Sequence, residues 1–159
     1  MPSSIAAQPQ GGGGRDDGLR RPQRPFSTRA KVFFCKISDV QCRTGKKGFN
    51  VDKIRDLYVF VVWRGVKGVH TQKLRFRLPD GYHYKTLETH FTTEATPSSL
   101  DVQVAQRSRG KPVVVGVLPV AGTFITQRSL LGKWTVEVFL DDEFVTKTRF
   151  TLRRRGRRR

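Results

Sequence analysis

Residues 132–140 read Gly-Lys-Trp-Thr-Val-Glu-Val-Phe-Leu, and this stretch decides the fold class. Large apolar side chains occupy every second position, which is the period of a half-buried β-strand. The residues expected to face a core are Trp134, Val136, Val138 and Leu140, with Thr135, Glu137 and Phe139 outward. An acidic turn, Asp141-Asp142-Glu143, separates this strand from a second β-like run at 144–152. The two runs together predict a β-hairpin.

Short β-like runs separated by turn residues fill the rest of the sequence from residue 31 onward. They lie at 31–37, 57–63, 71–78, 82–93, 100–105, 113–120 and 122–127. The run 57–63 is apolar on both faces, which predicts a central strand. Gly116 and Pro119 interrupt the run 113–120, which predicts an edge or bulged strand. Residues 64–68 contain two glycines, and we expect them to form a hairpin connection between 57–63 and 71–78.

The number and spacing of these runs predict the architecture. About seven to nine short strands with turns every ~8–12 residues are typical of a β-sandwich or a β-barrel. The two tryptophans, Trp63 and Trp134, lie on different runs and can pack between two sheets. We therefore predict an all-β, two-sheet sandwich.

Charge divides the 159 residues into one domain and two tails. The net charge is +18. Residues 1–30 are rich in Gly, Pro and Arg with few large apolar side chains, so we expect a disordered basic tail. Residues 31–152 form the predicted domain and hold half of the positive excess. Residues 153–159 contain six arginines and no acid, which makes them an arginine-rich C-terminal tail.

Two stretches resemble known domains. Residues 132–142, closed by Phe150-Thr151-Leu152, resemble the Gly-x-Trp-x-Val-x-Val hairpin that ends many bacterial immunoglobulin-like domains. Residues 61–65 and the Leu78-Pro79-Asp80-Gly81 turn resemble the first hairpin of the same families. The resemblance covers residues 32–152 and implies an immunoglobulin-like sandwich. Such domains are mostly envelope-associated modules of unknown function, so the resemblance implies no activity.

Two groups of basic residues are candidate anion sites. Guanidinium groups contact phosphates in bidentate fashion and release condensed counterions, so the arginine tail is the first candidate. A cationic row alternates along the run 71–78, and it becomes a patch if Lys147 and Arg149 lie on a neighbouring strand. The predicted anion- or nucleic-acid-binding residues are Arg153, Arg154, Arg155, Arg157, Arg158, Arg159, Lys73, Arg75 and Arg77. A solvated basic surface is the alternative for both groups.

The remaining candidates favour ordinary structural roles. The acidic cluster at 141–143 lies on a turn tip, too exposed for a raised carboxyl pKa. The spacing of His70, His83 and His90 does not suit a metal site. For Tyr82 and Tyr84 we favour core packing over base stacking. Cys35 and Cys42 can bridge in an oxidising compartment; otherwise Cys35 is a small core residue. We expect no enzymatic activity, no metal and no cofactor.

These observations favour a non-enzymatic binding module. We expect it to engage a protein partner or larger assembly, with basic tails contacting an anionic partner. The alternative is a nucleic-acid-binding protein without sequence specificity. No run approaches the ~20 apolar residues of a membrane span, and residues 3–14 are small and polar, without the apolar core of a signal peptide. We expect a soluble chain, cytoplasmic if complete and periplasmic or envelope-associated if a signal peptide has been removed.

Overall fold

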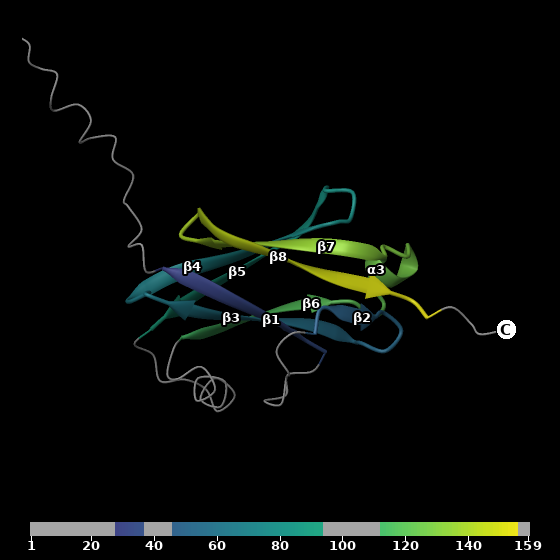
Figure 1. Ribbon diagram of the computed structural model, residues 1–159, viewed down its shortest axis with the longest axis horizontal. Coiled ribbons are helices and arrows are strands. Elements are labelled where there is room, and N and C mark those ends of the chain that lie inside the picture. The colour runs from purple at the N-terminus through teal and green to yellow at the C-terminus, as the bar shows by residue number, and fades with distance from the viewer. Residues whose placement is uncertain (1–27, 37–45, 94–111, 156–159) are drawn as a thin grey trace, which may run out of the picture.

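The computed structural model describes residues 28–36, 46–93 and 112–155, and they form two β-sheets packed face to face (Figure 1). Sheet A has the strand order β1-β3-β6. Its strands are β1 (Arg29–Cys35), β3 (Asp56–Arg64) and β6 (Val113–Pro119). Sheet B has the order β2-β8-β7-β4-β5. Its strands are β2 (Gly48–Asn50), β4 (Val69–Arg77), β5 (His83–Thr92), β7 (Gly132–Leu140) and β8 (Glu143–Arg153). The predicted all-β sandwich is confirmed.

The C-terminal hairpin is present as predicted. β7 and β8 are antiparallel, with Trp134 opposite Phe150. Asp141 and Asp142 connect them with φ values of 49° and 67°. Two successive left-handed residues match the twist of a two-residue hairpin turn, and aspartate tolerates this conformation better than most residues.

The connection at residues 64–68 is not a hairpin, so that prediction is wrong. β3 pairs with β1 and β6, whereas β4 pairs with β5 and β7. The connection therefore carries the chain from sheet A to sheet B. Gly65 and Gly68 supply the positive φ values, 75° and 92°, that this reversal needs. Glycines mark a turn, but they do not indicate which sheet receives the next strand.

The prediction of a strand at residues 122–127 is also wrong. The structure has a short helix there, α3 (Phe124–Gln127). Thr123 is the N-cap: its hydroxyl accepts a hydrogen bond from the backbone N–H of Ile125 at 3.2 Å. Ile125 then reaches the core with no exposed surface. The cap and this buried contact outweigh the β-propensity of the segment.

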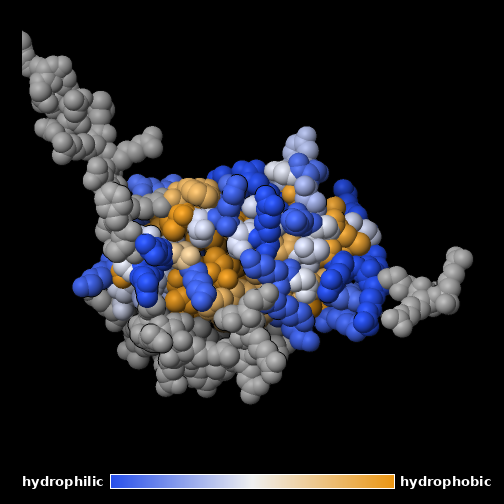
Figure 2. Space-filling model, viewed as in Figure 1, coloured by the Kyte–Doolittle hydropathy of each residue, from blue (hydrophilic) through white to orange (hydrophobic). Residues whose placement is uncertain are grey.

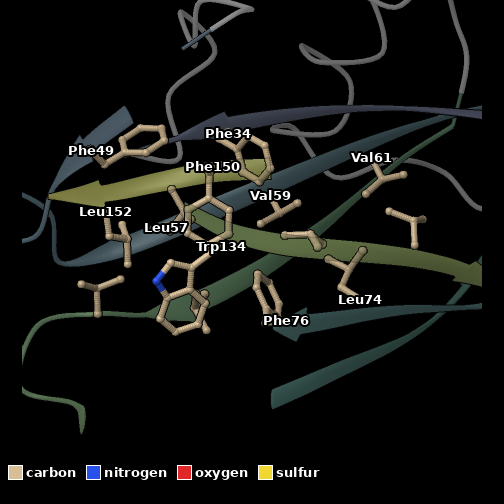
Figure 3. Packing of buried hydrophobic residues seen from close by; sticks show 14 of the residues in the cluster. Phe34, Phe49, Leu57, Val59, Val61, Leu74, Phe76, Trp134, Phe150 and Leu152 are labelled. Carbon is tan, nitrogen blue, oxygen red and sulfur yellow. The ribbon is translucent and has the colours of Figure 1, made fainter. Parts of the chain in front are cut away.

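The main core lies between the two sheets. Trp63 from sheet A and Trp134 from sheet B are both fully buried, as the sequence predicts. Phe150 stacks on Trp134 with ring centroids 5.8 Å apart and also contacts Phe34 at 5.2 Å. Figure 3 shows these rings gathered with Phe76 between strands of both sheets. Aromatic side chains bury about 150–250 Å² each, so these rings are large contributors to the core.

A second, smaller apolar cluster lies on the outer face of sheet A. Val59 and Val61 point into the main core, so the alternating residue Phe60 points the other way. Phe60 packs with Cys35 and is almost completely buried. Cys35 is disulfide-bonded, and the one other cysteine of the sequence, Cys42, lies outside the described residues. A disulfide is the state expected in an oxidising compartment.

Several sequence predictions fall outside the described residues. They are the tail at residues 1–27, the strand at 100–105 and the end of the arginine tail at 156–159. The described strands begin at Arg29 and end at Arg153, close to the expected limits of 31 and 152. Within the described ranges, no helix has the length and apolar character to cross a membrane.

Candidate anion-binding face

The outer face of sheet B carries four of the six candidate residues that the structure describes: Lys73, Arg75, Arg77 and Arg153. Leu74, Phe76, Trp134, Val136 and Phe150 point into the core, so the residues that alternate with them point outward. We call the outward surface the basic face. Its residues are Lys73, Arg75, Arg77, Thr86, Glu88, Lys133, Thr135, Glu137, Phe139, Phe144, Lys147, Arg149, Thr151 and Arg153. Seven of them are cationic and two are acidic, so the face carries a net positive charge.

The strand register places these residues in rows across the sheet. One row contains Phe144, Phe139, Lys73 and Glu88, and the next contains Lys147, Glu137, Arg75 and Thr86. A third contains Arg149, Thr135 and Arg77. Neighbouring strands are about 4.8 Å apart, so residues on adjacent strands of one row are in direct contact range.

The predicted cationic row on β4 exists, and each of its members already has a partner. Lys73 Nζ lies 2.5 Å from the Asp142 carboxylate and 3.9 Å from Glu88. The hydrogen bond to Asp142 raises the pKa of Lys73 above its ordinary value. Arg77 Nε donates a hydrogen bond to Glu137. Anion binding by this row remains a prediction, and a ligand there would have to compete with these acids.

The third member of the row has an aromatic partner. The Arg75 guanidinium lies over the ring of Phe139, 4.8 Å from its centroid. The ring's negative face attracts the cation, and the guanidinium keeps its charge. The ring of Phe139 therefore holds the Arg75 side chain in place, and its positive charge is not neutralised by a carboxylate.

Lys147 and Arg149 do not lie beside β4, because β7 separates β4 from β8. They lie opposite Glu137 and Thr135. Both are exposed, and among the described residues neither forms an ion pair. Glu137 is already bonded to Arg77, so these two cations of β8 are available to a ligand, as are the exposed Lys133 and Arg153 of the same face.

The arginine tail begins inside β8. Arg153 is the last residue of the strand, and its guanidinium lies over Gly48, 3.5 Å from where a Cβ would be. Arg154 Nε donates to both carboxylate oxygens of Asp52, at 3.3 and 3.2 Å, and the Nη1 atom donates to Ser129. Arg155 is exposed. The other predicted tail residues, Arg157, Arg158 and Arg159, lie outside the described residues.

Hydrophilic side chains gather where this tail leaves the sandwich. Figure 2 shows them over the right-hand end of the molecule, where Figure 1 places the end of β8 together with β2 and α3. Arg153 belongs to the basic face, whereas Arg154 is already paired with Asp52.

Sequence reasoning missed an aromatic pair on the same face. The rings of Phe139 and Phe144 meet edge to face with centroids 5.9 Å apart, and Phe144 is 47% exposed. Phe139 is outward by alternation, as predicted. Phe144 joins it because a register shift at Val138/Phe139 brings the two side chains together. Alternation alone does not reveal such a shift.

The expectation of core packing holds for one of the two tyrosines. Tyr84 packs edge to face on Trp134 with centroids 5.1 Å apart. Tyr82 lies in the turn before β5 and is 73% exposed, so the expectation is wrong there. A residue beyond the strand end is not bound by the strand's alternation.

The three histidines make separate contacts. His83 Nε2 lies 2.8 Å from the Thr86 hydroxyl, and His90 Nδ1 lies 2.9 Å from the Thr71 hydroxyl. His70 Nδ1 lies 2.6 Å from Asp141 Oδ2, and its Nε2 lies 2.7 Å from the carbonyl of Lys67. Within the described ranges, no cluster of three or more His, Cys, Asp or Glu side chains could hold a metal ion.

His70 and Asp141 form a charged pair. Both ring nitrogens of His70 face acceptors, so both must donate and the ring is an imidazolium. The hydrogen bond to Asp141 raises the pKa of His70, against the effect of partial burial. Partial burial raises the pKa of the Asp141 carboxyl, but the hydrogen bonds from His70 and Thr71 outweigh it and lower that pKa. Asp141 of the acidic turn thus links the β7–β8 hairpin to β4.

The strand orders decide the type of sandwich. Sheet A follows the order A-B-E of immunoglobulin domains, and β8-β7-β4-β5 in sheet B follows G-F-C-C′, with the letters in chain order. The chain is an immunoglobulin-like β-sandwich. β2 adds a short strand parallel to β8. The predicted immunoglobulin-like resemblance is confirmed at the level of the fold.

Comparisons with solved structures find similar chains at low sequence identity. An immunoglobulin-like protein of Pseudomonas aeruginosa is 16% identical, with a TM-score of 0.43, over 79% of this chain and 91% of its own. A CARDB domain from Pyrococcus furiosus, solved with two metal ions, is 15% identical, with a TM-score of 0.37, over 83% and 92%. No protein-family model and no curated protein matches the chain.

A third similar structure is much longer than this immunoglobulin-like chain. It is the alkylpurine DNA glycosylase AlkC of Pseudomonas fluorescens bound to DNA containing an abasic site analogue. It is 9% identical, with a TM-score of 0.44, over 80% of this chain and 30% of its own.

Proposed function

We propose that this domain is a non-enzymatic binding module that holds an anionic partner on the basic face. The sequence favours a protein partner or larger assembly, and nucleic acid without sequence readout is the second candidate. The exposed Phe144 beside the cations of β8 supports the second candidate.

One observation carries the proposal: β8 presents exposed cations that no carboxylate neutralises among the described residues. They are Lys147, Arg149 and Arg153. Lys147 and Arg149 alternate along the strand, and Arg153 follows four residues after Arg149. Alternate residues of a strand lie about 6.5–7 Å apart on the same face, so these cations form a line. A line of unpaired positive charge is suited to a linear or extended anionic surface.

The test measures binding of the full chain to inorganic polyphosphate and to polyglutamate, at about 50 mM salt where phosphate contacts are strong. We expect both polyanions to bind. The double variant Lys147→Gln/Arg149→Gln should weaken binding roughly 30-fold, because two lost charge-assisted contacts of about 1 kcal/mol each add to about 2 kcal/mol.

The control variant is Arg64→Gln/Lys67→Gln, which removes two exposed cations from the connection between the sheets. It changes the net charge equally, so a nonspecific charge effect would weaken binding as much as the first variant does. Equal losses, or no binding to either polyanion, would refute the proposal.

A further inference from the structure

β8 combines two kinds of outward side chain along one line. The aromatic ring of Phe144 lies near the start of the strand, and the cations of Lys147, Arg149 and Arg153 follow toward its end. Arg154 and Arg155 continue the chain in the same direction. A partner lying along β8 would therefore meet first a ring and then a series of positive charges.

Phe144 is positioned to offer its ring to a ligand. Its edge-to-face contact with Phe139 holds it, and the guanidinium of Arg75 in turn lies over Phe139. Almost half of Phe144 is exposed. A single exposed phenylalanine is ordinary on a protein surface. One that is fixed beside a line of unpaired cations has the two features of a single-strand binding site, an aromatic ring for a base and positive charges for the phosphates.

The acidic turn next to Phe144 does not oppose a polyanion strongly. Asp142 is bonded to Lys73, and Asp141 is bonded to His70 and to the backbone N–H of Thr71. The carboxylates of Asp141 and Asp142 are thus each balanced by a cation on β4. From Phe144 to the end of β8, every charged side chain is positive: Lys147, Arg149 and Arg153.

We propose that the anionic partner is a single-stranded nucleic acid lying along β8, with one base stacked on Phe144. Its phosphates contact Lys147, Arg149 and Arg153. Such contacts position a strand without reading its sequence. A duplex keeps its bases stacked inside and cannot offer one to Phe144, and an acidic peptide or polyphosphate uses only the cations. The inference rests on the proposed function and names the partner of the same surface.

The test compares the wild type with Phe144→Leu, which keeps an apolar side chain and removes the ring. The probes are a labelled thymidine DNA oligonucleotide and inorganic polyphosphate, measured by fluorescence anisotropy and by competition. We expect Phe144→Leu to weaken oligonucleotide binding roughly 5- to 150-fold, the range for loss of one base–aromatic stack. Polyphosphate binding should stay unchanged.

Two further variants separate stacking from a general loss of structure. Phe144→Tyr keeps an aromatic ring and should retain oligonucleotide binding. Phe124→Leu removes a ring on α3 that is 57% exposed and also has a guanidinium over it, that of Arg128 at 5.0 Å. It should bind the oligonucleotide like the wild type. Thermal unfolding of every variant checks that the fold is intact.

The outcomes distinguish this inference from the proposed function. If both probes bind and Phe144→Leu binds the oligonucleotide as tightly as the wild type, the stacking inference is wrong and the anion-binding function stands. Tighter binding of polyglutamate than of the oligonucleotide would overturn the inference in favour of an acidic protein partner. If no polyanion binds, both proposals fail.

Discussion

Gly116 determines how closely the two sheets approach each other near the middle of β6. A Cβ at this position would lie 2.7 Å from Leu74 Cδ1, closer than real Cβ contacts allow. Gly116 lies opposite Val59 in sheet A, and Leu74 is fully buried in sheet B. The glycine that interrupts the run 113–120 in the sequence is therefore a packing residue. Close-packed interiors tolerate added methyl groups poorly.

We expect Gly116→Ala to lower the free energy of unfolding by about 1–3 kcal/mol, because Leu74 must leave its packed position. Urea unfolding measures the effect. Gly48→Ala is the matched control, since Gly48 is also a strand residue and its Cβ would meet only the Arg153 guanidinium at 3.5 Å. Equal effects of both substitutions would show that the contact with Leu74 does not limit the packing.

At the scale of elements, the β7–β8 hairpin is attached to β4 by its own turn. Asp141 bonds to His70 through one carboxylate oxygen and to the Thr71 backbone through the other. Asp142 bonds to Lys73. These contacts hold two non-glycine residues in left-handed conformations, each of which costs about 1 kcal/mol or more.

The His70–Asp141 contact should make the stability of this attachment depend on pH. The pKa of His70 is raised above 6.5 in the folded state, so its contribution is complete below 6.5 and is lost as pH rises through the folded value. The pKa of Asp141 is lowered below 3.8, so its contribution is present above 3.8 and is lost as pH falls through the folded value.

We therefore expect the wild type to exceed Asp141→Asn in free energy of unfolding most strongly between pH 3.8 and 6.5. The difference should shrink on both sides of that window. Urea unfolding of the two proteins at a series of pH values measures this difference. In a His70→Gln background, the difference should no longer shrink as pH rises above 6.5. A difference that is independent of pH would show that the pair does not act through its charges.

The whole molecule has two unlike outer faces. The outer face of sheet A carries an apolar cluster around Phe60 and the disulfide-bonded Cys35. The outer face of sheet B is cationic, and its charge is only partly balanced by Glu88, Glu137 and Asp142. The net charge of +18 thus includes fixed positions on one sheet as well as the two tails.

Binding of a single strand to such a surface should depend steeply on salt. Each neutralised phosphate contributes about 0.7 to the slope of log affinity against log salt concentration for single strands. Lys147→Gln/Arg149→Gln should therefore reduce the slope by about 1.4. A salt series with the oligonucleotide measures it, with Arg64→Gln/Lys67→Gln expected to keep the wild-type slope. An unchanged slope in the first variant would exclude phosphate contacts by these two residues.

Local rules were sufficient for most of the strands and for the face that most strand residues occupy, but they failed at residues 122–127 and at Phe144. Side chains alternate along any extended chain, so the pattern in 132–140 predicted the buried Trp134 and the outward Phe139 without knowledge of neighbours. The helix at Phe124–Gln127 also had a local signal, the capping Thr123, which the β-branched and aromatic composition of the segment obscured.

Apart from the β7–β8 hairpin, only the tertiary structure decided which strands are neighbours. It placed β3 and β4 in different sheets, inserted β7 between Lys73 and Lys147, and brought Asp142 and Glu137 to the cations of β4. These contacts join residues about 60–70 positions apart in the chain. Strand order and register depend on the simultaneous burial of many such distant residues, which no local pattern encodes. The sequence by itself determined that the chain is a basic β-sandwich; the packing of its sheets determined which of its charges remain available to a partner.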